Sequence, residues 1–183
     1  PNSTLDFNVK VTASDGTSTI SDIFQIGVAP VVNTVAISSA TGIQNSLLNA
    51  GDTVITTVSF TELVNVTGTP QLTLNIGGTA VQANYVSGSG SSSLTFSYTI
   101  LSGQTDANGI SLSANALNLN GGTIKDAVGN NATLSTTAVI DNAGYKVDTT
   151  APTLGTLSLT DTGSSSSDGI TNNGTVTVGA IET

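Results

Sequence analysis

Hydrophobic and polar residues alternate with a period of two in several stretches of the chain. The alternating sets are Leu5, Phe7, Val9 and Val11; Val54, Thr56, Val58 and Phe60; Leu72, Leu74 and Ile76; and Leu94, Phe96, Tyr98 and Ile100. Successive side chains of a β-strand point to opposite faces, so this period places the apolar members of each set on one face. The pattern predicts a series of strands, each with one face turned toward a core.

Short turn-forming segments separate these alternating runs. They are Asp15-Gly16, Gly77-Gly78, "SGSGSSS" at 87–93, Asn108-Gly109, Gly121-Gly122 and Gly129-Asn130. Such segments suit tight connections between antiparallel strands. Thr, Ser, Asn, Gly and Val dominate the composition and only 8% of residues are charged, which favours many short strands over helices or disorder. We therefore predict an all-β chain with a β-sandwich architecture.

An internal repeat sets the predicted domain boundaries. "APVVNTVAIS" at 29–38 matches "APTLGTLSLT" at 151–160, and the same offset of 122 residues aligns Thr53-Val54 with Thr175-Val176. Residues 1–29 are interpreted as the closing hairpin of one domain, with strands at 5–13 and 22–28. Residues 30–151 are predicted to be one complete sandwich. Residues 152–183 are predicted to contain two opening strands, at 153–160 and 175–181, of a third domain, so that the chain is a window of a tandem array.

Composition excludes several classes of function. The chain has no His and no Cys, which removes His- and Cys-based metal sites, disulfides and Ser-His-Asp or Cys-His catalysis. Three Lys stand against twelve acids, for a net charge of −9, so nucleic acid and anionic membranes are not expected partners. No apolar run is long enough to span a bilayer, and residues 1–29 do not resemble a signal peptide. We therefore expect any export signal of the parent protein to lie outside these residues.

The central segment resembles the bacterial Ig-like tandem repeats of giant surface adhesins, including RTX-type and biofilm-associated proteins. The likeness is carried by "GDTVITTVSFTELVNVTG", "ALNLNGGTIKDAVGNNA" and "VDTTAP", and by the second repeat start "DTGSSSSDGITNNGTVTV". "VTASDGTSTISDIFQIGV" is similar to the end of a cadherin-like domain. The resemblance implies an all-β fold of Ig-like, Greek-key β-sandwich repeats in tandem. It also implies an extracellular, non-catalytic spacer array on the bacterial cell surface, in which acids at the domain joints bind Ca²⁺ and stiffen the chain.

The positions of the acids can be tested for this role independently of the resemblance. Ca²⁺ takes six to eight oxygen ligands, and a sandwich brings its loops together only at its two poles. If the first strand runs away from the linker, the loops after the second and sixth strands return to it. Glu62 and Asp126 are then expected at the pole beside residues 29–30, with Asn130 close by. These two acids are candidate metal ligands at the first joint.

The second joint offers a different set of acids. Asp148 in the linker and Glu182 after the second opening strand are expected at one pole of the third domain, while Asp161 and Asp168 bracket a loop at its opposite pole. Subtracting the 122-residue offset maps Asp148, Asp161 and Asp168 onto Ile26, Ser39 and Ser46. Because the first joint lacks the linker acid, we predict that Ca²⁺ binds more readily at the second joint.

Plainer interpretations remain open for several acids. Asp15 and Asp168 precede glycine in turns, where Asp is used for backbone reasons, and Glu62 can be a solvated loop acid. At the level of function, the leading hypothesis is a calcium-stiffened extender whose partners are neighbouring repeats. The alternatives are a subunit of a head-to-tail filament of identical chains, formed by strand complementation, and an adhesive domain that binds a glycan or a host protein. Tyr85 and Tyr145 are the aromatic candidates for such binding, whereas Tyr98 is predicted to lie in the core.

Overall fold

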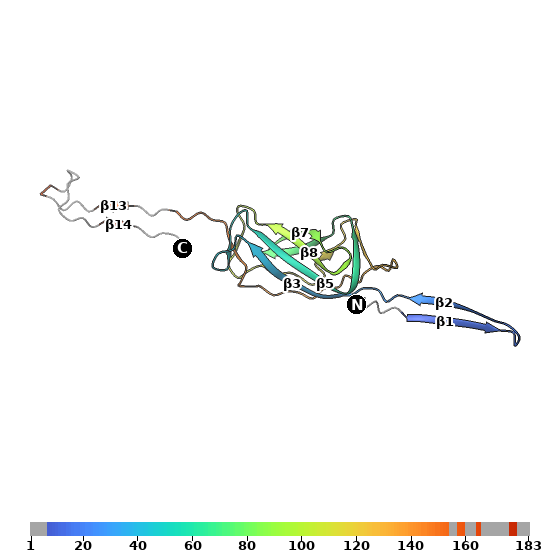
Figure 1. Ribbon diagram of the computed structural model, residues 1–183. Coiled ribbons are helices and arrows are strands. Elements are labelled where there is room, and N and C mark those ends of the chain that lie inside the picture. Colours follow the sequence, from blue (N-terminus) through green and yellow to red (C-terminus); the bar gives the residue numbers. More distant parts are fainter. Residues whose placement is uncertain (1–6, 154–156, 160–163, 166–175, 179–183) are drawn as a thin grey trace. The chain divides into compact units, whose positions relative to one another are not determined.

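The computed structural model (Figure 1) describes residues 7–153, 157–159, 164–165 and 176–178. The described residues form strands and turns and contain no helix. The chain divides into two compact units, Pro1–Thr149 and Thr150–Thr183. The strands of the first unit are β1 (Phe7–Ser14), β2 (Thr19–Ile26), β3 (Val32–Thr41), β4 (Leu47–Leu48), β5 (Thr53–Thr67), β6 (Gln71–Ile76), β7 (Thr79–Ser87), β8 (Ser91–Thr99), β9 (Thr105–Asp106), β10 (Leu117–Asn118), β11 (Thr123–Lys125) and β12 (Lys146–Asp148).

Strand β5 organises the first unit because it pairs with three other strands. Along its first half it lies antiparallel to β3 on one side and to β8 on the other. Near its end it pairs with β11, through Asn65–Thr67 and Thr123–Lys125. Strands β7, β6 and β10 continue the sheet beyond β8 in that order, and all its pairings are antiparallel.

A smaller sheet brings the end of the first unit back to its early strands. Strand β12 pairs in parallel with β4 and antiparallel with β9. Further single bridges, between Leu112 and Val139 and between Asn75 and Ser111, tie the connecting segments to the large sheet and to one another. The early and late parts of the sequence thus close over the same core.

The core is built from the inward positions of the large sheet and from apolar residues of the closing segments. In β5 the burial alternates strictly from Val54 to Phe60, as a period of two requires. The buried apolar residues are Ile37, Leu48, Val54, Val58, Phe60, Val64, Leu72, Leu74, Ile76, Ala83, Leu94, Phe96, Ile100, Ile110, Leu112, Ala116, Leu117, Ile124 and Val147. Tyr98, predicted to be core, is half-buried and packs against this cluster.

The hairpin of β1 and β2 forms a separate two-stranded sheet. Its turn is tight: Asp15 N–H donates to the Ser18 carbonyl over 3.2 Å, and Gly16 adopts φ +88°. The side chains of Val9 and Val11 are 41% and 52% exposed. The alternation at 5–11 therefore predicted a strand with one apolar face, but that face is not covered as the equivalent face of β5 is.

In the second unit, β13 (Leu157–Leu159) pairs antiparallel with β14 (Val176–Val178). Both strands lie within the two opening strands that the sequence predicted. The prediction of an all-β fold with antiparallel sheets is thus confirmed, and the first unit is consistent with a β-sandwich. The assignment of three domains and the tandem array stay predictions.

Candidate functional site

The chain enters the sandwich at one end of β5, which we call the Pro30 pole. Thr61 N–H donates to the Val31 carbonyl over 2.9 Å, and Val31 N–H donates to Thr61 Oγ1 over 3.0 Å. Thr133 N–H donates to the Pro30 carbonyl over 2.8 Å, which adds the segment after β11 to the same end. The first residues of β3 are thereby clamped between β5 and a late segment of the chain.

The chain leaves the sandwich at the other end, which we call the Thr149 pole (Figure 1). There Lys146 N–H donates to the Ser46 carbonyl over 2.9 Å, and Gly103 N–H donates to Thr149 Oγ1 over 2.8 Å. The loop that carries Gly103 follows β8, whose last residue Thr99 pairs with the first residue of β5, Thr53. The Pro30 pole, by contrast, lies beyond the level at which Phe60 pairs with Val32.

Glu62 lies within β5 and not in a loop, so the interpretation of Glu62 as a loop acid is wrong. The strand runs on to Thr67 because β11 pairs with its last residues and because Gly90 N–H donates to the Val64 carbonyl over 2.8 Å. The period of two then turns Glu62 inward with Phe60 and Val64, and its side chain is only 4% exposed. Its Oε1 has no hydrogen-bond partner among the described residues.

An unpaired carboxylate oxygen in this position is energetically unfavourable. Removing a charged group from water without compensating partners costs several kcal/mol. Most buried polar groups in proteins have a hydrogen-bond or metal partner, so an orphaned oxygen points to an interaction with a further group. Glu62 is the residue at the Pro30 pole that most needs such a group.

Asp126 begins the loop that follows β11, and it is 7% exposed. Its Oδ1 accepts from Val128 N–H over 3.0 Å and from Asn130 N–H over 2.8 Å, while its Oδ2 accepts from Asn130 Nδ2 over 2.7 Å. Burial acts to raise the pKa of Asp126, but the hydrogen bonds from Asn130, Gly129 and Val128 outweigh it and hold the pKa below its ordinary value. Asp126 is therefore held as an anion and also shapes its own loop.

Glu62 and Asp126 are brought to the same pole. The loop that holds Asp126 returns through Ala132, whose N–H donates to the Ile124 carbonyl over 2.9 Å, directly before Thr133 reaches Pro30. Strand order alone had placed both acids there. Among the described residues no group of three or more acids gathers that could hold a metal ion. A cation at this pole would therefore also draw on backbone carbonyls and water, and the roles of Glu62 and Asp126 as ligands stay predictions.

The remaining candidate metal ligands are Asp148, Glu182, Asp161 and Asp168. Asp148 is the last residue of β12, where it pairs with Thr105 at the Thr149 pole, and its side chain is half-buried. Glu182, Asp161 and Asp168 lie outside the described residues. Their assignment as metal ligands at the second joint and in the following loop stays a prediction.

Asp106 is a buried acid that the sequence analysis did not single out. It is 4% exposed, and its oxygens accept from Gly77 N–H over 2.7 Å and from Gly109 N–H over 2.9 Å. The carboxylate thus ties the β6–β7 turn to the loop after β9. The sequence signal was the Asp-x-x-Gly spacing before Gly109, which is typical of a side chain that caps its own turn. We assign Asp106 a structural role.

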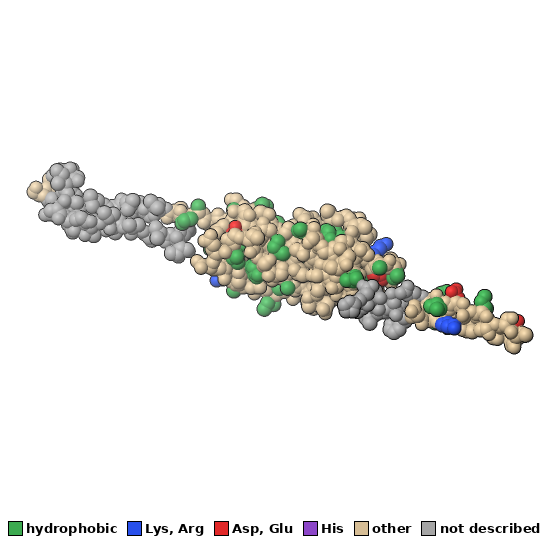
Figure 2. Space-filling view, in the orientation of Figure 1, with side chains coloured by type: hydrophobic (Ala, Val, Ile, Leu, Met, Phe, Trp, Pro, Cys, Tyr) green, Lys and Arg blue, Asp and Glu red, His purple; other side chains and the backbone are tan. Residues whose placement is uncertain are grey.

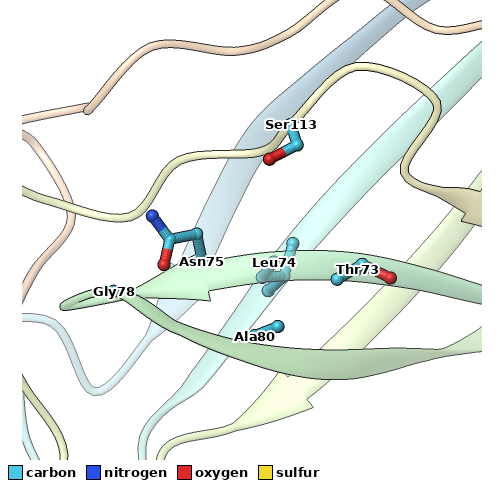
Figure 3. Close-up of a pocket in the computed structure, with 6 residues that line it drawn as sticks. All are labelled: Thr73, Leu74, Asn75, Gly78, Ala80 and Ser113. Carbon is cyan, nitrogen blue, oxygen red and sulfur yellow. The ribbon is translucent and has the colours of Figure 1, made fainter.

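One surface pocket of about 320 Å³ lies beside the β6–β7 hairpin (Figure 3). It is lined by Thr73, Leu74, Asn75, Gly78, Ala80 and Ser113. Asn75 Nδ2 donates to Ser111 Oγ over 3.2 Å, and Thr73 Oγ1 donates to Gln82 Oε1 over 3.1 Å, so the side chains of Asn75 and Thr73 already have partners. The lining has no aromatic or charged side chain of the kind that binds sugars or anions. The adhesive-domain alternative thus draws no support from this pocket.

Comparisons with protein-family models, with curated proteins and with solved structures gave no match to the chain. A search of the described residues for helices that are long and apolar enough to cross a membrane found none.

Proposed function

We propose that this chain is a non-catalytic structural module that extends a bacterial surface adhesin or fibre outside the cell. The observation that carries the proposal is that the chain enters the sandwich at the Pro30 pole and leaves it at the Thr149 pole. A domain with this topology adds its own length to whatever precedes and follows it. An enzyme or receptor domain has no need for its two connections to lie at opposite ends.

The separation between the two poles can be judged from β5. Seven residue steps separate Thr53 from Phe60, and at about 3.3 Å per step the two levels lie about 23 Å apart. Antiparallel pairing with β3 and β8 fixes this stretch on both sides. The sandwich would therefore act as a rigid spacer, and bending would be concentrated at the joints.

Calcium is proposed to stiffen the joint at the Pro30 pole. Glu62 Oε1 supplies a buried carboxylate oxygen that has no hydrogen-bond partner among the residues described, and Asp126 Oδ2 accepts a hydrogen bond from Asn130 Nδ2. Hard cations such as Ca²⁺ take oxygen ligands of this kind together with backbone carbonyls and water. Bound Ca²⁺ would offset part of the net charge of −9 and stabilise the buried acid. The second joint, with Asp148 and Glu182, is proposed to work in the same way.

This mechanism would make the stiffness of the joints depend on whether the chain is inside or outside the cell. In a cytoplasm poor in Ca²⁺ the joints would stay flexible, and outside the cell they would stiffen. The partners of the module would be neighbouring repeats, while target binding would belong to other domains. Asp161 and Asp168 would contribute a separate site in the following repeat.

The test is a thermal unfolding series in Ca²⁺ and in chelator, with Glu62→Gln as the informative variant. In the wild type a ligand at 100 times its Kd would stabilise the fold by about 2.7 kcal/mol. We expect Glu62→Gln to lose most of this response and to be at least as stable as the wild type in chelator, because it removes an unpaired buried charge. Asp141→Asn is the matched control, since Asp141 is an exposed acid already bonded to Asn108, and it should keep the full response.

Small-angle scattering on the same samples separates binding from stiffening. The proposal expects a larger maximum dimension in Ca²⁺ than in chelator. If neither the melting temperature nor the maximum dimension of the wild type differs between Ca²⁺ and chelator, the calcium mechanism is wrong. The extender role would then rest on pole topology alone.

A further inference from the structure

The sequence contains three Asn-Gly pairs, at 108–109, 120–121 and 173–174, and the last pair lies outside the described residues. Asn-Gly is the dipeptide in which an asparagine side chain loses its amide most readily, because glycine has no side chain to shield its own backbone nitrogen. The reaction also requires the backbone to rotate, so that this nitrogen can approach the side-chain carbon. Whether a pair reacts in a folded chain therefore depends on how firmly its surroundings hold it.

The first pair is held firmly. Gly109 N–H donates to the buried carboxylate of Asp106 over 2.9 Å, and Asn108 Nδ2 donates to Asp141 Oδ2. A Cβ on Gly109 would lie 2.0 Å from the backbone oxygen of Asn142, so a neighbouring loop lies directly against this backbone. The nitrogen that would attack and the amide that would leave are both engaged, and the backbone has no room to rotate.

The second pair forms an exposed two-residue turn. Asn120 and Gly121 have φ of +46° and +77°, and Gly122 N–H donates to the Leu119 carbonyl over 2.8 Å, as in a type I′ turn. A Cβ on Gly121 would meet no atom within 4 Å outside the adjoining residues. In the part of the chain that the structure describes, Gly121 N–H donates to no other group. The nitrogen that would attack is therefore accessible.

The Asn120 side chain is held only at the surface. Its Nδ2 donates to the Thr69 carbonyl over 3.2 Å, and its backbone N–H donates to Asn118 Oδ1 over 2.7 Å. Both bonds are exposed, so water can replace them when the turn opens. Exposed bonds of this kind open at a small cost in free energy, whereas Asn108 can react only after buried bonds break.

We propose that Asn120 is a site of spontaneous deamidation and that the fold protects Asn108 from the same reaction. The Gly121 backbone nitrogen attacks Asn120 Cγ and gives up its proton, and a five-membered succinimide ring forms. The side-chain amide takes up a proton and leaves as ammonia. Water then opens the ring at either carbonyl carbon, with its hydroxyl on the carbon and its proton on the nitrogen. The products are aspartate or isoaspartate at position 120.

Both products change the charge of the turn. A carboxylate replaces a neutral amide, and it can no longer donate to the Thr69 carbonyl. On the face seen in Figure 2, most side chains of the sandwich are uncharged and few acids are visible. Conversion of position 120 therefore adds one negative charge to a chain whose net charge is already −9.

Isoaspartate also lengthens the turn, because the main chain then runs through the former side chain. The turn leads directly into β11, and its last residue is tightly packed: a Cβ on Gly122 would lie 2.2 Å from the Thr67 carbonyl oxygen. A longer turn should therefore weaken the pairing of β11 with the end of β5. Because this pairing extends β5 and turns Glu62 inward, conversion at position 120 should weaken the sandwich at the Pro30 pole.

The test incubates the full chain at mildly alkaline pH and follows each Asn-Gly pair by mass spectrometry of peptides. Digestion at acidic pH prevents conversion during the measurement. We expect Asn120 to convert at least about tenfold faster than Asn108, because only surface bonds have to open. In denaturant, where neither pair keeps its surroundings, the two rates should become similar. Equal rates in the folded chain, or slower conversion at Asn120, would overturn the proposal.

Two variants test the physical causes. Asp106→Asn removes the carboxylate that holds Gly109, so it should speed conversion of Asn108 several-fold and leave Asn120 unchanged. An unchanged Asn108 rate in the folded variant would contradict the protection assigned to Asp106. If the variant does not fold, the comparison within the wild type still decides.

Asn120→Gly is the matched control for the effect on stability. Glycine adopts positive φ without strain, so the turn is kept while the reactive amide is removed. After incubation the wild type should melt at a lower temperature than before, and Asn120→Gly should not. An equal fall in both would show that conversion at position 120 does not weaken the sandwich. All these measurements can be made in chelator, so this proposal and the calcium mechanism fail separately.

Discussion

Strand β5 and the β1–β2 hairpin show the same sequence alternation and opposite burial. Val54 and Val58 in β5 are fully buried, whereas Val9 and Val11 in β1 are about half exposed. The difference lies outside the strands themselves: the inward residues of β5 share one buried apolar cluster with residues of later segments outside the large sheet, such as Ile110 and Leu112. A period of two thus predicts which side chains share a face, and a second layer decides whether that face is buried.

The contrast implies that the two regions contribute differently to stability. Apolar burial provides about 25 cal/mol per Å² removed from water, and the hairpin face retains much of its exposure. The cooperative unfolding transition should therefore reflect the stability of the sandwich. Equivalent substitutions in the hairpin should change the measured free energy of unfolding little. Four pairs of variants test this difference, each with one member in the sandwich and one in the hairpin.

The largest difference is expected for phenylalanine truncation. Phe96 is fully buried, and its ring meets that of Tyr85 edge-on at a centroid distance of 5.9 Å. Phe96→Ala should lower the free energy of unfolding by about 3–5 kcal/mol through lost burial and a new cavity. Phe24→Ala should lower it by less than about 0.5 kcal/mol, as for a surface substitution. Denaturant unfolding followed by circular dichroism measures both.

A loss at Phe24→Ala comparable with that at Phe96→Ala would mean that the hairpin face is covered in solution. Repeating the measurement at low protein concentration distinguishes the source of the cover. If the loss disappears on dilution, another copy covers the face, and if it persists, the chain does so itself.

Two glycines in the left-handed region provide the next comparison. Gly109 has φ +103°, and a Cβ there would lie 2.0 Å from the backbone oxygen of Asn142. Gly16, in the hairpin turn, has φ +88° and no atom within 4 Å of such a Cβ. Gly109→Ala should cost about 2–4 kcal/mol, since overpacking adds to backbone strain. Gly16→Ala strains only the hairpin turn and should leave the melting temperature of the sandwich unchanged.

If Gly16→Ala lowers the melting temperature as much as Gly109→Ala, the hairpin and the sandwich unfold as one cooperative unit. The steric difference at the two positions would then be secondary to the shared backbone strain.

Much of the fold could be predicted from the sequence because strands and tight turns are local. The alternation in β6, from Leu72 to Ile76, and the Gly77-Gly78 turn predicted a hairpin strand with a buried face, and the structure agrees. Whether a strand face is covered depends on segments that are distant in the sequence. The exposure of Val9 and Val11 was therefore not predicted. The pairing of β12 with β4, some 100 residues apart, likewise has no local signal.

The candidate site was predicted in position but not in detail. Strand order sufficed to bring Glu62 and Asp126 to one pole. The sequence could not show that β5 continues past Phe60 and turns Glu62 inward, because that depends on pairing with β11. Nor could it distinguish Asp126, which is bonded to its own loop, from Glu62, whose Oε1 has no hydrogen-bond partner in the part of the chain that the structure describes. Asp106 was missed because its partners come from two separate turns.

Asp126 and Asp15 form a third pair, because each accepts backbone N–H groups of its own turn. Asp15 Oδ1 accepts from Thr17 and Ser18 over 2.9 and 2.7 Å on the exposed hairpin turn. Asp126, by contrast, is itself buried, although Ala127, Val128 and Gly129 of its loop are exposed. Asp126→Ala should lower the free energy of unfolding by about 2 kcal/mol, because three partly buried hydrogen bonds lose their charged acceptor. Asp15→Ala should have no measurable effect on sandwich unfolding.

Equal losses for Asp126→Ala and Asp15→Ala would show that burial of the Asp126 side chain does not increase its contribution to stability. Asn130→Ala supplies a check within the sandwich, since it removes only the side-chain donor to Asp126 Oδ2. Its loss should be smaller than that of Asp126→Ala.

The smallest effect is a pH dependence, and its sign follows from the hydrogen bonds. The pKa of Asp126 is lowered in the folded chain, so the folded state binds this proton less tightly than the unfolded state does. The corresponding stability is fully present above the unfolded pKa of about 3.9 and is lost as the pH falls through the lower, folded pKa. The difference in unfolding free energy between the wild type and Asp126→Asn should therefore be constant above about pH 5 and shrink on acidification below that range. The pKa of Asp15 is also lowered, by hydrogen bonds from Ser18 and Thr17. Asp15→Asn should nevertheless leave the acid profile of the sandwich unchanged, because we expect the hairpin turn to take no part in the cooperative unfolding of the sandwich. A difference for Asp126→Asn that grows on acidification would mean that the folded state binds this proton more tightly than the unfolded state does. A matching change for Asp15→Asn would mean that the hairpin and the sandwich unfold together.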